Sequence, residues 1–71
     1  MKKTDWAAAV NALFQSGVTA VEIADATHSS RQAVYYWASG QREPQGSNIT
    51  LLTALCNKRN IKLQAKKNPA V

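Results

Sequence analysis

The sequence predicts an all-α fold, a compact domain of four or five helices, from three observations. The chain has 71 residues, enough for one small core and too few for two. Apolar residues recur at helical spacing, as at Trp6, Val10 and Leu13. Serine or threonine before such segments and glycine after them divide the chain into pieces a few turns long.

The first two helices are bounded by capping residues. Thr4 can cap the first helix, with Asp5 in its first turn, and Gly17 ends it. Thr19 opens a short second helix of about residues 20–26, and Glu22 completes a capping box with it. The polar residues that follow, 27–29, are poor in helix interiors and predict a turn.

The third and fourth helices flank a loop. Ser30 caps the third helix, about residues 31–39, and Gly40 closes it. Residues 41–46 contain proline and glycine and form the loop. Either Ser47 or Asn48 caps the fourth helix, whose apolar residues at helical spacing are Ile49, Leu52, Leu55 and Cys56.

The end of the chain is less regular. Residues 61–65 alternate apolar and polar side chains, which predicts a short strand or a last amphipathic helical turn. Residues 66–71 are expected to form a frayed, basic, flexible tail. The organisation expected is therefore one domain over residues 1–65, followed by that tail.

Composition limits the function classes. One cysteine, Cys56, cannot form an internal disulfide, and with one histidine it cannot complete a four-ligand zinc site. The sequence has no carboxylate pair at useful spacing and no glycine-rich phosphate loop, so we expect neither an enzyme nor a cofactor. No leader or membrane-spanning segment is recognisable, which favours a cytoplasmic protein with no membrane partner.

The net charge of +5 is unevenly distributed. Residues 1–30 contain two lysines and three acidic residues, whereas residues 31–71 contain seven basic residues and Glu43 as their one acid. A basic half indicates an anionic partner, either nucleic acid or an anionic membrane surface, although it can also serve solubility alone.

Residues 19–40 read TAVEIADATHSSRQAVYYWASG, two short helices joined by a tight turn. This segment resembles the helix-turn-helix of the lambda-repressor-like (Cro/C1-type) family of bacterial and phage regulators, and the resemblance runs from Gly17 to Pro44. Ala24 is small where the two helices would touch, and Val34 and Trp37 face the domain. Four positions depart from the family pattern, and they are Ala20, Thr27, His28 and Ser29.

The resemblance implies a recognition helix that lies in the major groove of operator DNA. Its implied base-reading residues are Arg31, Gln32, Tyr35, Tyr36 and Arg42. Arginine can pair with guanine and glutamine with adenine. The implied contacts to the DNA backbone are Thr19, Ser30, Gln41, Ser47 and Asn48.

The function expected is a small Cro-like repressor that binds a pseudo-palindromic operator as a homodimer, without a small-molecule effector. Leu51, Ile61 and Leu63 are apolar beyond what one small core needs, which marks them as interface candidates. The alternatives are an activator or an antitoxin of the same fold, or a helical protein-interaction module that does not bind DNA. A basic peptide on a membrane surface would need a continuous helix, which Pro44 and the caps disfavour.

Overall fold

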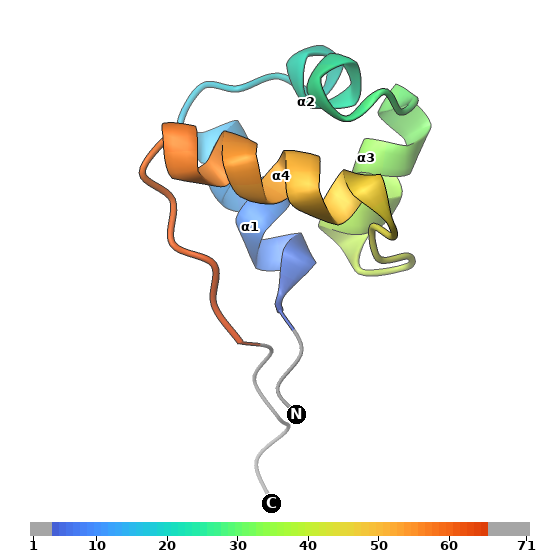
Figure 1. Ribbon diagram of the computed structural model, residues 1–71. Helices are drawn as coiled ribbons and strands as arrows, with labels where there is room; N and C mark the ends of the chain where they lie inside the picture. Colours follow the sequence, from blue (N-terminus) through green and yellow to red (C-terminus); the bar gives the residue numbers. More distant parts are fainter. Residues whose placement is uncertain (1–3, 66–71) are drawn as a thin grey trace, which may run out of the picture.

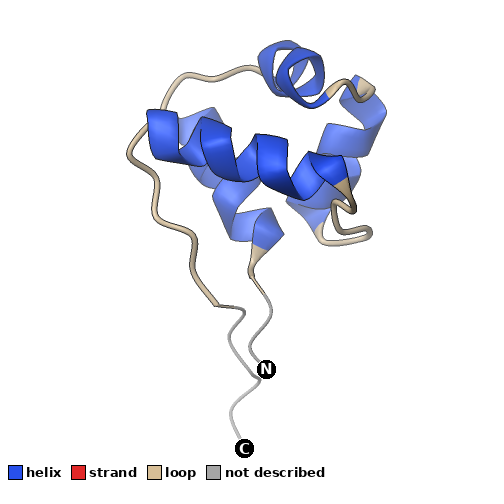
Figure 2. Cartoon of the chain, in the orientation of Figure 1, coloured by secondary structure: helices blue, strands red, loops and turns tan. Residues whose placement is uncertain are grey.

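The computed structural model describes residues 4–65, which form four helices and no strand (Figures 1 and 2). These are α1 (Trp6–Gln15), α2 (Ala20–Thr27), α3 (Arg31–Ser39) and α4 (Ser47–Lys58). Helix α3 packs against α1 and α2, and α2 packs against α4. In the view of Figure 1, α4 passes in front of α1, α2 lies at the top and α3 lies at the right. The prediction of an all-α fold is confirmed, with four helices in the described part of the chain.

The core lies between the four helices. Its buried apolar residues come from every helix and from Val18 in the first connection. They are Trp6, Ala9, Val10, Leu13, Val18, Ala20, Ile23, Ala24, Val34, Trp37, Leu52 and Cys56. The stripes predicted from helical spacing in α1 and α3 are therefore the faces that pack inward.

The start of α1 differs from the prediction. Asp5 is its N-cap, and the Asp5 carboxylate accepts a hydrogen bond from the Ala8 amide at 3.0 Å. Thr4, which was expected to cap the helix, instead forms an isolated antiparallel bridge with Ala65. The Asp5 amide also donates to the Gln64 carbonyl at 2.7 Å. The C-terminal segment thus holds the backbone at residue 4 extended, and the helix starts one residue later.

Helix α2 has the capping box that the sequence predicts. The Glu22 amide donates to the Thr19 hydroxyl at 3.2 Å, and the Thr19 amide donates to the Glu22 carboxylate at 3.4 Å. The helix runs one residue further than expected, to Thr27, whose buried hydroxyl donates to the Ile23 carbonyl at 2.8 Å. This internal bond satisfies a polar group at a core position.

His28 makes the turn between α2 and α3. Its backbone is left-handed, with φ 54° and ψ 40°. That conformation favours glycine, and histidine is among the residues that tolerate it better than most. Ser30 then caps α3 by accepting from the Ala33 amide at 3.1 Å, and Gly40, with φ 82°, closes the helix as predicted.

The predicted cap of α4 is wrong. Gly46 occupies the N-cap, no side chain caps the helix, and Ser47 and Asn48 lie in the first turn. At the other end, residues 61–65 form neither a strand nor a helical turn, apart from the bridge of Ala65. Their alternation arises because Ile61 and Leu63 pack against the core while the side chains between them face solvent.

Candidate nucleic-acid interface

Helix α3 is held at both ends by side chains from other helices. At its C-terminal end, the Asn11 amide of α1 donates to the Ala38 carbonyl at 3.0 Å. At its N-terminal end, the Ser29 hydroxyl lies within donating distance of two acceptors, the Thr27 carbonyl at 3.2 Å and the Asn48 amide oxygen on α4 at 3.4 Å. These bonds fix the position of α3 in the domain, so its outer side is a defined surface.

That outer side is polar. Val34 and Trp37 are buried, as predicted, whereas Arg31 and Gln32 are exposed. Tyr36 is half-buried at the edge of the buried side. The exposed side chains near the helix start end in groups that donate or accept hydrogen bonds.

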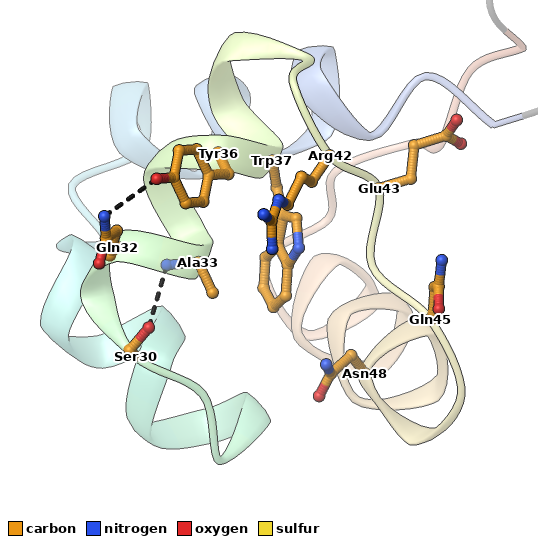
Figure 3. A pocket seen from close by; sticks show the side chains of 9 residues that line it. All are labelled: Ser30, Gln32, Ala33, Tyr36, Trp37, Arg42, Glu43, Gln45 and Asn48. Atoms are coloured by element: carbon orange, nitrogen blue, oxygen red, sulfur yellow. Dashed lines mark hydrogen bonds between the residues drawn. The ribbon is translucent and has the colours of Figure 1, made fainter.

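A groove of about 660 Å³ lies between α3, the loop after it and the start of α4 (Figure 3). It brings together five of the ten residues predicted to contact DNA. These five are Ser30, Gln32, Tyr36, Arg42 and Asn48. Three separate chain segments supply them, and the surface therefore depends on the tertiary fold as well as on α3.

The Tyr36 side chain contacts two of the others, Gln32 and Arg42 (Figure 3). The Gln32 amide nitrogen donates to the Tyr36 hydroxyl at 3.0 Å. The guanidinium carbon of Arg42 lies 5.1 Å from the centre of the Tyr36 ring, which is cation–π distance. The Arg42 amide also donates to the Tyr36 carbonyl at 3.3 Å. We call Gln32, Tyr36 and Arg42 the reading cluster.

Two predicted base-reading residues lie outside the groove. Arg31 lines a shallower hollow of about 380 Å³ between α2 and α3, which it shares with Asp25 and His28. The Tyr35 ring packs at a tilt of 41° against Phe14, with 6.3 Å between ring centres, and the residue is 57% exposed. The remaining predicted backbone contacts are exposed but do not line the groove, and they are Thr19, Gln41 and Ser47.

Sequence reasoning missed three residues that shape the site. Glu43 and Gln45 line the groove from the loop. Asn11 belongs to a different helix and acts on α3 through its bond to Ala38. The position of the loop depends on tertiary contacts, so no local pattern indicated Glu43 or Gln45. A polar side chain between the apolar residues of α1 was the one available sign of Asn11.

The basic residues of the described chain fall into separate regions. Arg42 lines the groove, whereas Lys58 ends α4 and Arg59 follows it. Lys58 lies about 15 Å along the helix axis from Asn48, at 1.5 Å per residue. The basic tail predicted over residues 66–71 lies outside the described residues. Among the described residues after residue 30, the positive charge thus does not form one continuous patch at the groove.

The remaining chemistry of residues 4–65 is sparse. No three His, Cys, Asp or Glu residues gather there in a way that could hold a metal ion. None of the helices in this part of the chain is long and apolar enough to cross a membrane. Cys56 is fully buried in the core, and desolvation raises the pKa of its thiol.

Comparisons with models of known protein families, with curated proteins and with solved structures gave no match.

Proposed function

We propose that the protein is a sequence-specific double-stranded DNA-binding regulator of transcription, a Cro-like repressor in which α2, the His28 turn and α3 act as a helix-turn-helix. The observation that supports this most is the reading cluster. Gln32 and Arg42 are the residue types that pair with adenine and guanine edges, and Tyr36 holds both at one groove. A rigid helix with such side chains outward suits the major groove.

The capping residues supply contacts to the DNA backbone. The Thr19 and Ser30 hydroxyls accept hydrogen bonds from their own helices, so each still has a proton to donate to a phosphate oxygen. Asn48 accepts from Ser29 through its oxygen, which leaves its amide nitrogen as a donor. The amides at the starts of α2 and α3 add the positive ends of two helix dipoles.

Two copies would bind two half-sites. One short helix reads only a few base pairs, and useful specificity commonly requires a dimer on half-sites about one turn of DNA apart. Of the interface candidates, Ile61 and Leu63 already pack partly against the core, and Leu51 is half-buried. Sedimentation at micromolar concentration, with and without operator DNA, tests the dimer. A monomer under both conditions, with one protein per site when operator DNA is present, would contradict it.

Selection of bound duplexes from random DNA tests the function. A repressor of this type should enrich one motif with approximate two-fold symmetry. The affinity for that motif should exceed the affinity for unrelated duplexes by about a thousandfold or more at physiological salt. Enrichment of no motif would overturn sequence-specific binding. A motif that lies beside a toxin gene would favour an antitoxin, and activation of a promoter carrying it would favour an activator.

A protein-interaction module without DNA binding is the second candidate. Val21 and Tyr35 are more than half exposed, and Ile49 is 40% exposed, so the surface offers apolar contacts outside the groove. These residues lie on three different helices, α2, α3 and α4. Such a module should show no sequence preference on DNA, so the same selection separates the two functions.

A further inference from the structure

Tyr36 is the centre of the reading cluster. Its hydroxyl accepts from Gln32 at 3.0 Å, its ring lies 5.1 Å from the guanidinium carbon of Arg42, and its carbonyl accepts from the Arg42 amide at 3.3 Å. Tyr36 is half-buried, whereas Gln32 and Arg42 are exposed. Tyr36, which has the least conformational freedom of the three side chains, therefore orients Gln32 and Arg42, which have more.

Both exposed side chains keep the groups that recognise bases. Gln32 uses one hydrogen of its amide nitrogen on Tyr36, which leaves the other hydrogen and the amide oxygen free. Adenine presents an acceptor and a donor in the major groove, and that remaining pair of groups matches them. A guanidinium over an aromatic ring still has in-plane donors at its edge, which can reach guanine or a phosphate.

We infer that Tyr36 is a positioning residue that couples Gln32 and Arg42, so the protein recognises the two base positions they face as one unit. The inference rests on the proposed function. Long side chains lose rotamer freedom when they bind, and groups held beforehand in the bound arrangement avoid part of that loss. The hydroxyl acts on Gln32 and the ring acts on Arg42, so the two effects can be separated by substitution.

Two substitutions at Tyr36 make the separation. Tyr36→Phe removes the hydroxyl and keeps the ring under Arg42, whereas Tyr36→Leu removes both. Each is combined with Gln32→Ala and with Arg42→Ala, and affinity is measured on the motif that the parent protein selects. Thr53→Val is the control, because it also removes a hydroxyl that makes one hydrogen bond, to the Ile49 carbonyl at 2.7 Å, at a position on α4 that does not line the groove.

Tyr36→Phe should weaken binding by about three- to tenfold, as expected for one hydrogen bond. In the Gln32→Ala background, Tyr36→Phe should cause little further loss of affinity. In the Arg42→Ala background, the fold-losses of the two substitutions should multiply, because they act independently. Base preference should relax in Tyr36→Phe only at the position that Gln32→Ala affects. In Tyr36→Leu it should relax at the Arg42 position as well. Thr53→Val should leave both preferences unchanged, and the midpoint of thermal unfolding should not move in Tyr36→Phe.

The outcomes distinguish the inference from the function. If the parent protein selects no motif, the proposed function fails and the inference falls with it. Suppose that the parent selects a motif, but the fold-loss of affinity from Tyr36→Phe is as large in the Gln32→Ala background as in the Arg42→Ala background. That result overturns the inference and leaves the proposed function standing. The same holds if Tyr36→Phe lowers affinity for every sequence without changing base preference. Should Tyr36→Leu fail to fold, the phenylalanine variant and its two double variants decide the matter.

Discussion

The guanidinium carbon of Arg42 lies 5.1 Å from the centre of the Tyr36 ring, although the end of α3 separates the two residues in sequence. Gly40 makes this approach feasible, because its left-handed backbone at φ 82° reverses the chain after the helix. The amides of Gln41 and Arg42 then bond back to the Tyr36 carbonyl. The loop is thereby held over the outer edge of α3, and a loop side chain becomes part of the same surface as the helix.

Gln32→Ala should reduce the free energy of binding to the selected motif by about 1–3 kcal/mol and relax preference at one base position. The physical reason is the loss of a side chain that can contact a base edge with two groups. Electrophoretic shift or fluorescence anisotropy measures the affinity. Gln15→Ala is the control, since Gln15 is an exposed glutamine at the end of α1. Equal effects of the two substitutions would remove Gln32 from the interface.

Glu43→Gln should strengthen binding to every duplex alike. Glu43 lines the groove beside Arg42, and its negative charge would repel phosphates. The change keeps the size of the side chain and removes one like-charge repulsion, so the gain should shrink as salt rises.

A different result at Glu43 would assign it another role. Carboxylates can accept a hydrogen bond from the amino group of cytosine. If Glu43→Gln lowers affinity and relaxes preference at a single position, Glu43 reads a base and the prediction of repulsion is wrong.

His28→Gly should raise the free energy of unfolding by about 0.5–1 kcal/mol. His28 has a left-handed backbone at φ 54°, a conformation that costs a residue with a side chain about 1–2 kcal/mol. Glycine removes this cost, but its greater conformational entropy in the unfolded state offsets part of the gain. Urea unfolding measures the change. Gly17→Ala is the converse test of the cost of a side chain at positive φ. Gly17 has φ 98°, so alanine there should destabilise the domain. Destabilisation by His28→Gly would mean that the imidazole itself stabilises the turn.

The free energy of unfolding should fall as the pH rises above the ordinary thiol pKa, about 8.5. Burial raises the pKa of Cys56 in the folded state, so the folded thiol keeps its proton where the unfolded thiol loses it. Unfolding then releases a proton, which favours the unfolded chain at higher pH. Urea unfolding from pH 7 to pH 10 checks this, with Cys56→Ala as the reference for all other titrating groups. Parallel pH profiles of the two proteins would contradict it.

The sequence was sufficient where the determinants are local. The capping box of Thr19 and Glu22, the Ser30 cap and the closing glycine at residue 40 all depend on neighbours within one turn, and each is present in the structure. The inward face of α3 followed in the same way from the spacing of Val34 and Trp37.

The sequence was insufficient where distant segments meet. The start of α1 depends on pairing between Thr4 and Ala65, so local cap preference chose the wrong residue. At α4, the Asn48 side chain bonds to Ser29 instead of capping its own helix. The groove depends on the path of the loop after α3, which hydrophobic spacing does not encode. For the same reason the separation of Arg31 from Gln32 on the surface could not be foreseen.

Purines that lack the N7 acceptor test most directly whether α3 reads base edges in the major groove. 7-Deazaadenine and 7-deazaguanine, which change only the major-groove edge, are placed one at a time in the selected motif. We predict a loss of about tenfold at the position that Gln32 faces, and no further loss there in Gln32→Ala. Full affinity of the parent protein for every substituted duplex would contradict major-groove reading by α3.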